Sequence, residues 1–264
     1  MTITEFSNQF DVLYNNITSN QAPGLNEYEK SVFLTKAQNE IVKNYFTANS
    51  KGNNIGQGFD DSAKRQADFS MLMKTSTGTT VTTNPPTRID YRSRIFKFPS
   101  DIFIVINEAL KKGLTSYEQF QIIPLRYDEY TRLMSKPYKR PLKDQAWRLI
   151  NSGSSSDKYV EIITTPENDP PKSGTDTVSY ILRYVRRPKP IIVGDLDGLT
   201  IDGYEYSSSP SQSANPPQTN GECELDPMLH EDILQRAVEL AKVAWTATGQ
   251  DNAQMVLQAG QRSE

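Results

Sequence analysis

The chain has few of the residues on which catalytic and metal sites most often depend. Its 264 residues include a single histidine, His230, and a single cysteine, Cys223. One cysteine excludes an internal disulfide framework and suits a reducing compartment. One histidine and one cysteine are also too few ligands for a structural zinc site. We therefore expect no structural metal.

Catalytic and cofactor motifs are scarce as well. A Ser-His-Asp or Cys-His site would have to use His230, and no sequence feature holds this residue beside Cys223. The glycines at 52–58 lack the Lys-Ser/Thr ending of a phosphate-binding loop. The acidic stretch 195–206 is a poor calcium loop, because its glycine is misplaced and Tyr206 stands where a glutamate is needed. These patterns predict no enzyme, no catalytic residue and no bound cofactor or metal.

Long apolar runs are missing too. No stretch approaches the ~18 apolar residues of a membrane-spanning helix. The start, MTITEFSNQF, has neither the basic residues nor the apolar stretch of a secretion signal. Hydrophobic residues form 36 % of the chain, and its 14 glycines raise the share to about 41 %, a little below that of an ordinary globular protein. We expect no membrane anchor, synthesis in the cytoplasm, and many residues in polar loops.

Charge, in contrast, is strongly segregated along the chain. Residues 88–189 contain 19 basic and 12 acidic side chains, a balance of +7, whereas residues 190–235 contain nine acidic side chains and no basic one. Either the composition of the loops produces this by chance, or the two segments form surfaces that attract each other between copies of the protein. For the second case the candidate interface residues are Arg140, Lys143, Arg186, Arg187, Asp195, Asp197, Asp202, Glu222 and Glu224.

Helix patterns occur near both ends of the chain. Helices are predicted at 3–17, 27–47, 61–73 and 227–249, and the first, second and last have apolar residues along one face. Thr2 and Glu5 have the spacing of a capping box. Asn26 is a favourable N-cap, and Asp226 followed by Pro227 is a favoured helix start.

The middle of the chain has strand patterns instead. Strands are predicted at 75–83, 94–98, 102–106, 119–125, 159–165 and 178–185, with a short helix at 128–134. The segment 94–98 alternates basic and apolar residues, as a half-buried strand does. Segments 151–157, 166–176 and 207–220 are rich in Ser, Pro, Gly and Asn and are expected to be exposed loops.

The order of these elements predicts an α+β fold. We expect a helical bundle of the N- and C-terminal helices, packed with an antiparallel β-rich middle region and long exposed loops. In this interpretation residues 1–264 form a single domain. Its helical part is 1–75 and 225–260, its β-rich part is 76–206, and 207–224 is a flexible arm.

Three motifs resemble segments of structural proteins from crAss-like Bacteroides phages, in the same order. They are PLRYDEYTRLMSKPYKRPLKDQAWRLI at 124–150, YILRYVRRPKPIIVGDLDGL at 180–199 and CELDPMLHEDILQRAVELAK at 223–242. With the helical start at 26–46, the resemblance covers most of the chain. It extends to the podovirus head-to-tail adaptors, also called tail tubular proteins.

The resemblance implies a structural virion protein, assembled in the cytoplasm of the host bacterium. It implies a homo-oligomeric ring, usually a dodecamer, in the head-to-tail connector or tail. Such a ring docks on the portal protein or on other connector and tail rings, and phage DNA passes through its lumen. The family has no catalytic residues to transfer. A ring also needs two different surfaces on each subunit, which the opposed charges can supply.

Two other functions compete with this one. The stretch 130–148 interleaves basic residues with Tyr130, Tyr138 and Trp147, which is typical of nucleic-acid binding through phosphates and stacking. A pI near 5.4 argues against a dedicated binder, so nucleic-acid binding during genome packaging is the alternative. A tail enzyme such as a peptidoglycan hydrolase lacks an acid/base pair in this sequence.

Overall fold

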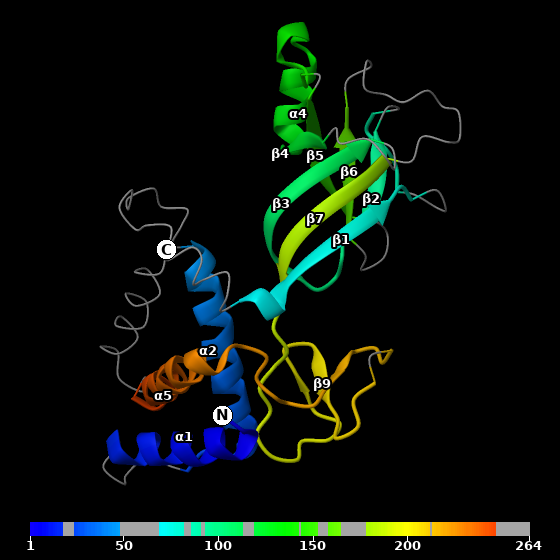
Figure 1. Cartoon of the computed structure of the whole chain (residues 1–264). Coiled ribbons are helices and arrows are strands. Elements are labelled where there is room, and N and C mark those ends of the chain that lie inside the picture. Colours follow the sequence, from blue (N-terminus) through cyan, green and yellow to red (C-terminus); the bar gives the residue numbers. More distant parts are fainter. Residues whose placement is uncertain are drawn as a thin grey trace. The chain divides into compact units, whose positions relative to one another are not determined.

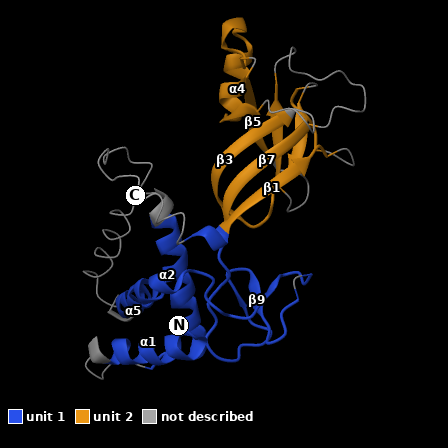
Figure 2. Ribbon diagram, viewed as in Figure 1, with its two compact units in different colours: residues 1–72, 187–264 blue, residues 73–186 orange. Residues whose placement is uncertain are grey.

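The chain folds into two units, each with a core of its own (Figure 2). A computed structural model describes residues 1–17, 24–47, 69–81, 86–90, 93–112, 119–142, 144–152, 158–164, 178–211 and 213–246. Unit 1 consists of residues 1–72 and 187–264, and unit 2 consists of residues 73–186. The helices near the two chain ends belong to unit 1 and the large sheet belongs to unit 2, which confirms the α+β class.

Unit 1 is built on three helices that begin where their caps predict. They are α1 (Ile3–Ile17), α2 (Glu27–Thr47) and α5 (His230–Thr246), the last preceded by a 3₁₀ turn, η4 (Pro227–Leu229). The Thr2 amide donates to Glu5 Oε2 at 2.8 Å, and the Glu5 amide donates to Thr2 Oγ1 at 3.3 Å. Asn26 and Glu29 cap α2 in the same reciprocal way, at 2.9 and 2.8 Å. These bonds satisfy amides that the first helical turn leaves free.

The three helices share one apolar core, with α5 against both α1 and α2 (Figure 1). Its buried side chains include Phe6, Phe10, Tyr14, Leu34, Ala37, Val42, Ile233, Leu234, Ala237, Val238 and Ala241. Burying each large side chain contributes about 1.5–3 kcal/mol. The predicted bundle of N- and C-terminal helices is therefore confirmed.

An extended segment after residue 186 completes unit 1. Ile191, Ile192 and Val193 are buried in it, and it continues into a small sheet of order β10-β9-β8. The strands are β8 (Thr200–Ile201), β9 (Tyr204–Tyr206) and β10 (Gln218–Thr219). Strands this short were not predicted, and β10 lies within the predicted loop 207–220.

Unit 2 is a seven-stranded sheet of order β1-β7-β3-β4-β5-β6-β2. Its strands are β1 (Met73–Thr79), β2 (Arg94–Lys97), β3 (Ile102–Lys112), β4 (Gln119–Pro124), β5 (Gln145–Ser152), β6 (Lys158–Ile163) and β7 (Val178–Arg186). An antiparallel bridge joins Thr80 to Phe96, and the Val81 amide donates to the Ile95 carbonyl at 2.8 Å. These bonds link the two edge strands, so the sheet closes into a barrel (Figure 1).

The sequence predicted an antiparallel sheet, but the barrel contains one parallel pair of strands. Strands β4 and β5 pair in parallel, while the other neighbours pair antiparallel. Parallel neighbours need a crossover, which is made here by α4 (Tyr127–Met134) and the 3₁₀ turn η2 (Pro137–Lys139). The short helix predicted at 128–134 is therefore part of the crossover that lets β5 start beside the first residues of β4 and run in the same direction.

Apolar side chains fill the barrel and also cover part of its outer face. The inner cluster is Phe96, Leu110, Phe120, Ile122, Ala146, Val160, Ile162, Val178, Tyr180, Leu182 and Tyr184. Outside, Trp147, Leu149 and Ile163 pack against Tyr130, Leu133 and Met134 of α4. The Tyr130 and Trp147 rings meet edge to face, with centroids 6.4 Å apart. Residues 146–149 of β5 are thus buried on both faces, which explains why the strand has no alternating pattern and was not predicted.

Two other predictions were wrong in detail. The helix predicted at 61–73 does not reach Met73, because Ser70–Leu72 form a 3₁₀ turn, η1, and Met73 begins β1; residues 61–68 lie outside the described part of the chain. The alternation expected at 94–98 fails, since Ile95 and Phe96 are both buried. The predicted loop 166–176 lies outside the described residues, as does most of 151–157.

Candidate assembly surfaces

The boundary between the two units is also a boundary of charge. Unit 1 contains 11 basic and 20 acidic side chains, a formal charge of −9. Unit 2 contains 18 basic and 12 acidic side chains, a formal charge of +6. The structural division therefore separates charge almost as sharply as the sequence segments do.

The main acidic feature of unit 1 is the turn at 194–198, which we call the acidic turn. Asp195 and Asp197 are exposed there, and neither pairs with a basic side chain among the described residues. Asp197 Oδ1 accepts a hydrogen bond of 3.1 Å from the Ser208 amide. Burial, and then the carboxylates of Asp195 and Asp197, raise the pKa of the Tyr206 hydroxyl, so these three side chains lie near one another.

Three other interface candidates of unit 1 form ion pairs or hydrogen bonds within the unit. Arg187 Nη1 lies 3.5 Å from Asp202 Oδ1, and Asp202 Oδ2 accepts from Asn39 at 3.0 Å. Glu224 accepts from the Lys189 amide at 3.1 Å, and its carboxylate is 3.7 Å from Lys189 Nζ. These contacts fix the extended segment and leave less of this charge for a partner.

The remaining candidates lie at separate places. Glu222 is exposed and accepts from Asn220 Nδ2 at 3.2 Å. Arg186 is half-buried at the end of β7, opposite Ile102. Arg140 is exposed just after η2, and Lys143 lies outside the described residues.

Arg140 belongs to a larger basic surface, residues 132–142, which we call the basic knuckle. Four cations of the knuckle are exposed and have no ion-pair partner in the described part of the chain: Arg132, Lys136, Lys139 and Arg140. Between them stands Tyr138, whose side chain is 99 % exposed. The list of interface candidates drawn from sequence missed most of this surface, although the basic and aromatic pattern around 130–148 had marked its position.

Prolines, local hydrogen bonds and the packing of α4 hold the backbone of the basic knuckle in place. Pro137 begins η2 and Pro141 is buried. The Lys136 amide donates to the Leu133 carbonyl at 3.1 Å, and the Lys139 amide donates to the Lys136 carbonyl at 3.0 Å. The preceding helix α4 is anchored on the outside of the barrel. Prolines and local hydrogen bonds restrict the backbone that carries Tyr138.

Comparison with known proteins identifies the family. The family model described as "Phage tail ring protein 3/4" matches residues 1–253. The chain belongs to the phage tail ring protein 3/4 family. This ring protein is 49 % identical over 264 residues to "Ring protein 4/5" of Bacteroides phage crAss001. The matched region covers 100 % of both chains. It is 31 % identical over 255 residues to "Ring protein 3" of the same phage, covering 93 % of this chain and 97 % of the relative.

The resemblance to crAss-like phage ring proteins is thereby confirmed. The ring protein has a structural role in the phage particle, as a component of its tail. In the part of the ring protein that the structure describes, no helix is both long and apolar enough to cross a membrane. No three His, Cys, Asp or Glu side chains of the same residues are placed to hold a metal ion.

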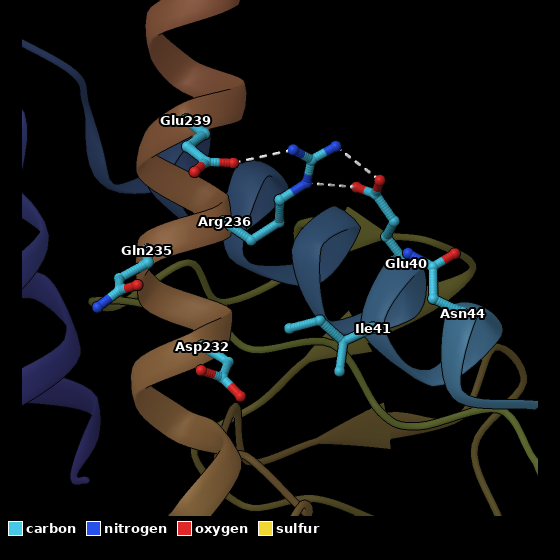
Figure 3. Close-up of a pocket in the computed structure, with 7 residues that line it drawn as sticks. All are labelled: Glu40, Ile41, Asn44, Asp232, Gln235, Arg236 and Glu239. Carbon is cyan, nitrogen blue, oxygen red and sulfur yellow. Dashed lines mark hydrogen bonds and ion pairs between the residues drawn. The ribbon is translucent and has the colours of Figure 1, made fainter. Parts of the chain in front are cut away.

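One hollow of the ring protein lies between α2 and α5 (Figure 3). Its charged centre is Arg236, whose Nε and Nη2 donate to the Glu40 carboxylate at 3.0 and 2.6 Å, while Nη1 donates to Glu239 at 2.9 Å. These hydrogen bonds raise the pKa of Arg236 further. Because two carboxylates already neutralise the guanidinium, this cluster acts as a cross-link between two helices.

A second polar cluster lies inside the barrel. Arg148 Nε is 3.2 Å from Glu108 Oε2, with 13 % and 7 % of the two side chains exposed. The Tyr180 hydroxyl donates to Glu108 Oε1 at 2.9 Å. Burial raises the pKa of Glu108, although Arg148 and Tyr180 oppose the shift. Burial and the neighbouring Glu108 raise the pKa of Tyr180. The cluster ties β3, β5 and β7 together.

His230 links the N-terminus of the ring protein to the start of α5. Its Nε2 donates to the Leu225 carbonyl at 3.0 Å, so Nδ1 accepts from the Met1 ammonium at 2.7 Å. The ring also packs on Phe6, with centroids 5.2 Å apart. Burial lowers the pKa of His230 and raises the pKa of Cys223 to about 11. Both imidazole nitrogens of His230 are thus used in hydrogen bonds. The Cys223 thiol stays protonated at neutral pH.

Proposed function

We propose that the chain is the subunit of a closed homo-oligomeric ring, a dodecamer, in the head-to-tail connector or tail of a phage. The ring docks on the portal protein or on an adjacent ring and forms part of the channel through which DNA passes. It is assembled in the host cytoplasm, carries no membrane anchor and has no enzymatic activity.

The observation that carries this proposal is the charge of the two units, −9 for unit 1 and +6 for unit 2. A ring of identical subunits needs a heterologous interface, in which two different patches of each subunit meet. Opposite charge makes two such patches complementary and disfavours contact of a patch with itself. A durable interface of this kind buries more than about 1,000 Å².

The non-enzymatic role agrees with how the buried polar groups are used. Arg236 and Arg148 each face carboxylates of the same unit, and His230 bonds on both nitrogens. We also propose that the two units act as one subunit, and that exposed residues of the loop 207–220 contact a neighbouring copy. The interface candidates of this proposal are the nine residues named from sequence.

Electron microscopy and native mass spectrometry of the purified full chain test the proposal. We expect closed rings with a single subunit number, alone or after addition of the portal protein. A particle map should contain the same rings around the DNA path. A chain that stays monomeric with the portal protein present, or that is absent from purified virions, would contradict the proposal.

The exposed cations and Tyr138 of the basic knuckle favour one second candidate, nucleic-acid binding during genome packaging. A mobility-shift assay with labelled duplex DNA tests it. This function predicts salt-dependent binding by the wild type and loss of binding in the Arg140→Ala, Lys143→Ala double variant. Equal binding by both proteins, or none by either, would reject it.

A further inference from the structure

The basic knuckle has the features of a binding surface that lacks its partner. Its four cations, Arg132, Lys136, Lys139 and Arg140, are exposed and have no ion-pair partner among the residues described. Elsewhere in the structure several exposed cations do have such partners, as Lys74 has in Asp101 at 3.1 Å and Arg126 has in Asp128 at 3.4 Å. The knuckle therefore holds positive charge that the subunit itself does not use.

Tyr138 gives this surface an anchor. Its side chain is 99 % exposed, and it stands on a 3₁₀ turn whose first residue is Pro137. Tyrosine and arginine, with tryptophan, are enriched at the energetic centre of protein interfaces. A tyrosine loses little side-chain entropy on binding, because only two torsions become fixed.

Unit 1 offers a complementary surface in the acidic turn. Asp195 and Asp197 are exposed and have no basic partner in the described residues, and the whole segment 190–235 contains no lysine or arginine. The left-handed backbone at Gly194 and Gly198, with φ of 81° and 79°, shapes the turn that presents them. The turn is therefore a compact carboxylate surface that can receive guanidinium and ammonium groups.

We propose that the basic knuckle of one subunit docks on the acidic turn of the next copy of the chain. This inference rests on the proposed ring and names the contact that closes it. The knuckle and the turn belong to different units, so a head-to-tail contact between neighbours uses one surface from each copy.

The knuckle fits an acidic protein surface better than nucleic acid. Asp128 and Asp144 are exposed on either side of it in the chain, and Glu129 is half-buried. Asp128 pairs with Arg126, and the carboxylates on either side limit the length of the cationic surface, so it suits a compact acidic turn better than the extended phosphate chain of DNA. The chain itself supplies that turn.

Charge reversal in two separate proteins tests the contact. The knuckle variant is Lys139→Glu with Arg140→Glu, and the turn variant is Asp195→Lys with Asp197→Lys. The matched control, Lys158→Glu with Arg183→Glu, makes the same change in charge at exposed residues of unit 2. Ring formation by each full chain is followed by sedimentation velocity and electron microscopy, and folding by circular dichroism.

We expect rings from the wild type and the control, and none from either variant alone. The mixture of the two variants is the decisive sample. In an alternating ring, each acidic knuckle meets a basic turn and each basic knuckle meets an acidic turn, so equal amounts of the two proteins should assemble again. Rings in the mixture support the contact, because a general loss of stability is not repaired by mixing.

Other results separate the two proposals. If the wild type forms rings and the variants do so equally well, the contact is wrong and the ring proposal stands. The contact is also wrong if the mixture fails while the control assembles. If the variants form rings but lose a duplex-DNA shift that the wild type has, the knuckle binds nucleic acid instead. If the wild type never forms rings, even with the portal protein, both proposals fall.

Discussion

The backbone amide of Val193 donates a hydrogen bond of 2.8 Å to the hydroxyl of Ser31. The same hydroxyl donates to the Glu27 carbonyl of its own helix at 2.7 Å. Ser31, Thr35 and Gln38 are buried polar residues of α2 that bond to the backbone of one extended segment. Thr35 accepts from the Ile191 amide at 3.2 Å, and Gln38 donates to the Lys189 carbonyl at 3.2 Å. This row satisfies backbone groups of Lys189, Ile191 and Val193, while the Ile192 amide donates to the Gly221 carbonyl at 3.0 Å.

Ser31→Ala should lower the free energy of unfolding by about 1–3 kcal/mol, because the buried Val193 amide loses its acceptor. Urea titration followed by circular dichroism measures the change. Ser208→Ala, at an exposed position, is the control and should stay within about 0.5 kcal/mol of the wild type. Equal stabilities of the two variants would show that the row does not support the extended segment.

Arg148→Met should destabilise the barrel by about 3–5 kcal/mol, since Glu108 then keeps a buried charge without its partner. Adding Glu108→Gln removes that charge and keeps an acceptor for Tyr180, so the double variant should recover much of the loss. Lys74→Met breaks a more exposed pair with Asp101 and should cost less than about 1 kcal/mol. Chemical denaturation of all three variants is the measurement, and a double variant no better than Arg148→Met would contradict this role for the pair.

His230 should make stability depend on pH. Burial lowers its pKa in the folded chain below the ordinary value of 6.5. Between these two pKa values the unfolded chain binds more protons, so the free energy of unfolding decreases as the pH falls below 6.5 and stops changing below the folded pKa. Denaturant titrations above and below pH 6.5 should show a smaller decrease for His230→Gln. The same decrease in both proteins would assign the pH effect to other groups.

Gly221→Ala and Gly203→Ala form a matched pair. Both glycines have left-handed backbone, with φ of 81° and 82°, which costs an alanine roughly 1–2 kcal/mol. A Cβ at residue 221 would also lie 2.8 Å from the Ile192 carbonyl oxygen, whereas one at residue 203 has nothing within 4 Å. We therefore expect a larger loss of thermal stability at 221. A loss at 203 as large as that at 221 would contradict the close approach of Ile192.

Tyr138→Ala should weaken ring assembly at least about 30-fold in apparent Kd, the effect of losing an interface hot spot. The stability of the single subunit should not change, because the side chain is exposed. Sedimentation velocity over a concentration series measures the assembly. Tyr28→Ala, at an exposed tyrosine of α2, is the control. If both variants assemble equally well, Tyr138 is not an anchor of the interface.

Local patterns in the sequence were enough to predict the starts of three helices and most strands. The cap at Thr2, the cap at Asn26 and the Asp226-Pro227 start each act within a few residues, so their spacing alone reveals them. The strand at 178–185 alternates because one of its faces fills the barrel. The segregation of charge also belongs to the sequence, as does the family resemblance that pointed to a phage ring protein.

Tertiary structure alone decided the closure of the barrel, the parallel pairing of β4 with β5, and the use of each charge. These depend on residues far apart in the chain, and no local spacing encodes which of them meet. Asp202 and Asp195 are both acids of the same segment, yet only Asp202 has Arg187 nearby. Tyr138 resembles other tyrosines in the sequence, and only the surrounding 3₁₀ turn leaves it fully exposed among cations that have no ion-pair partner in the described residues. Burial and pairing are properties of the folded chain, which is why the sequence indicated a basic region and the structure located its projecting surface.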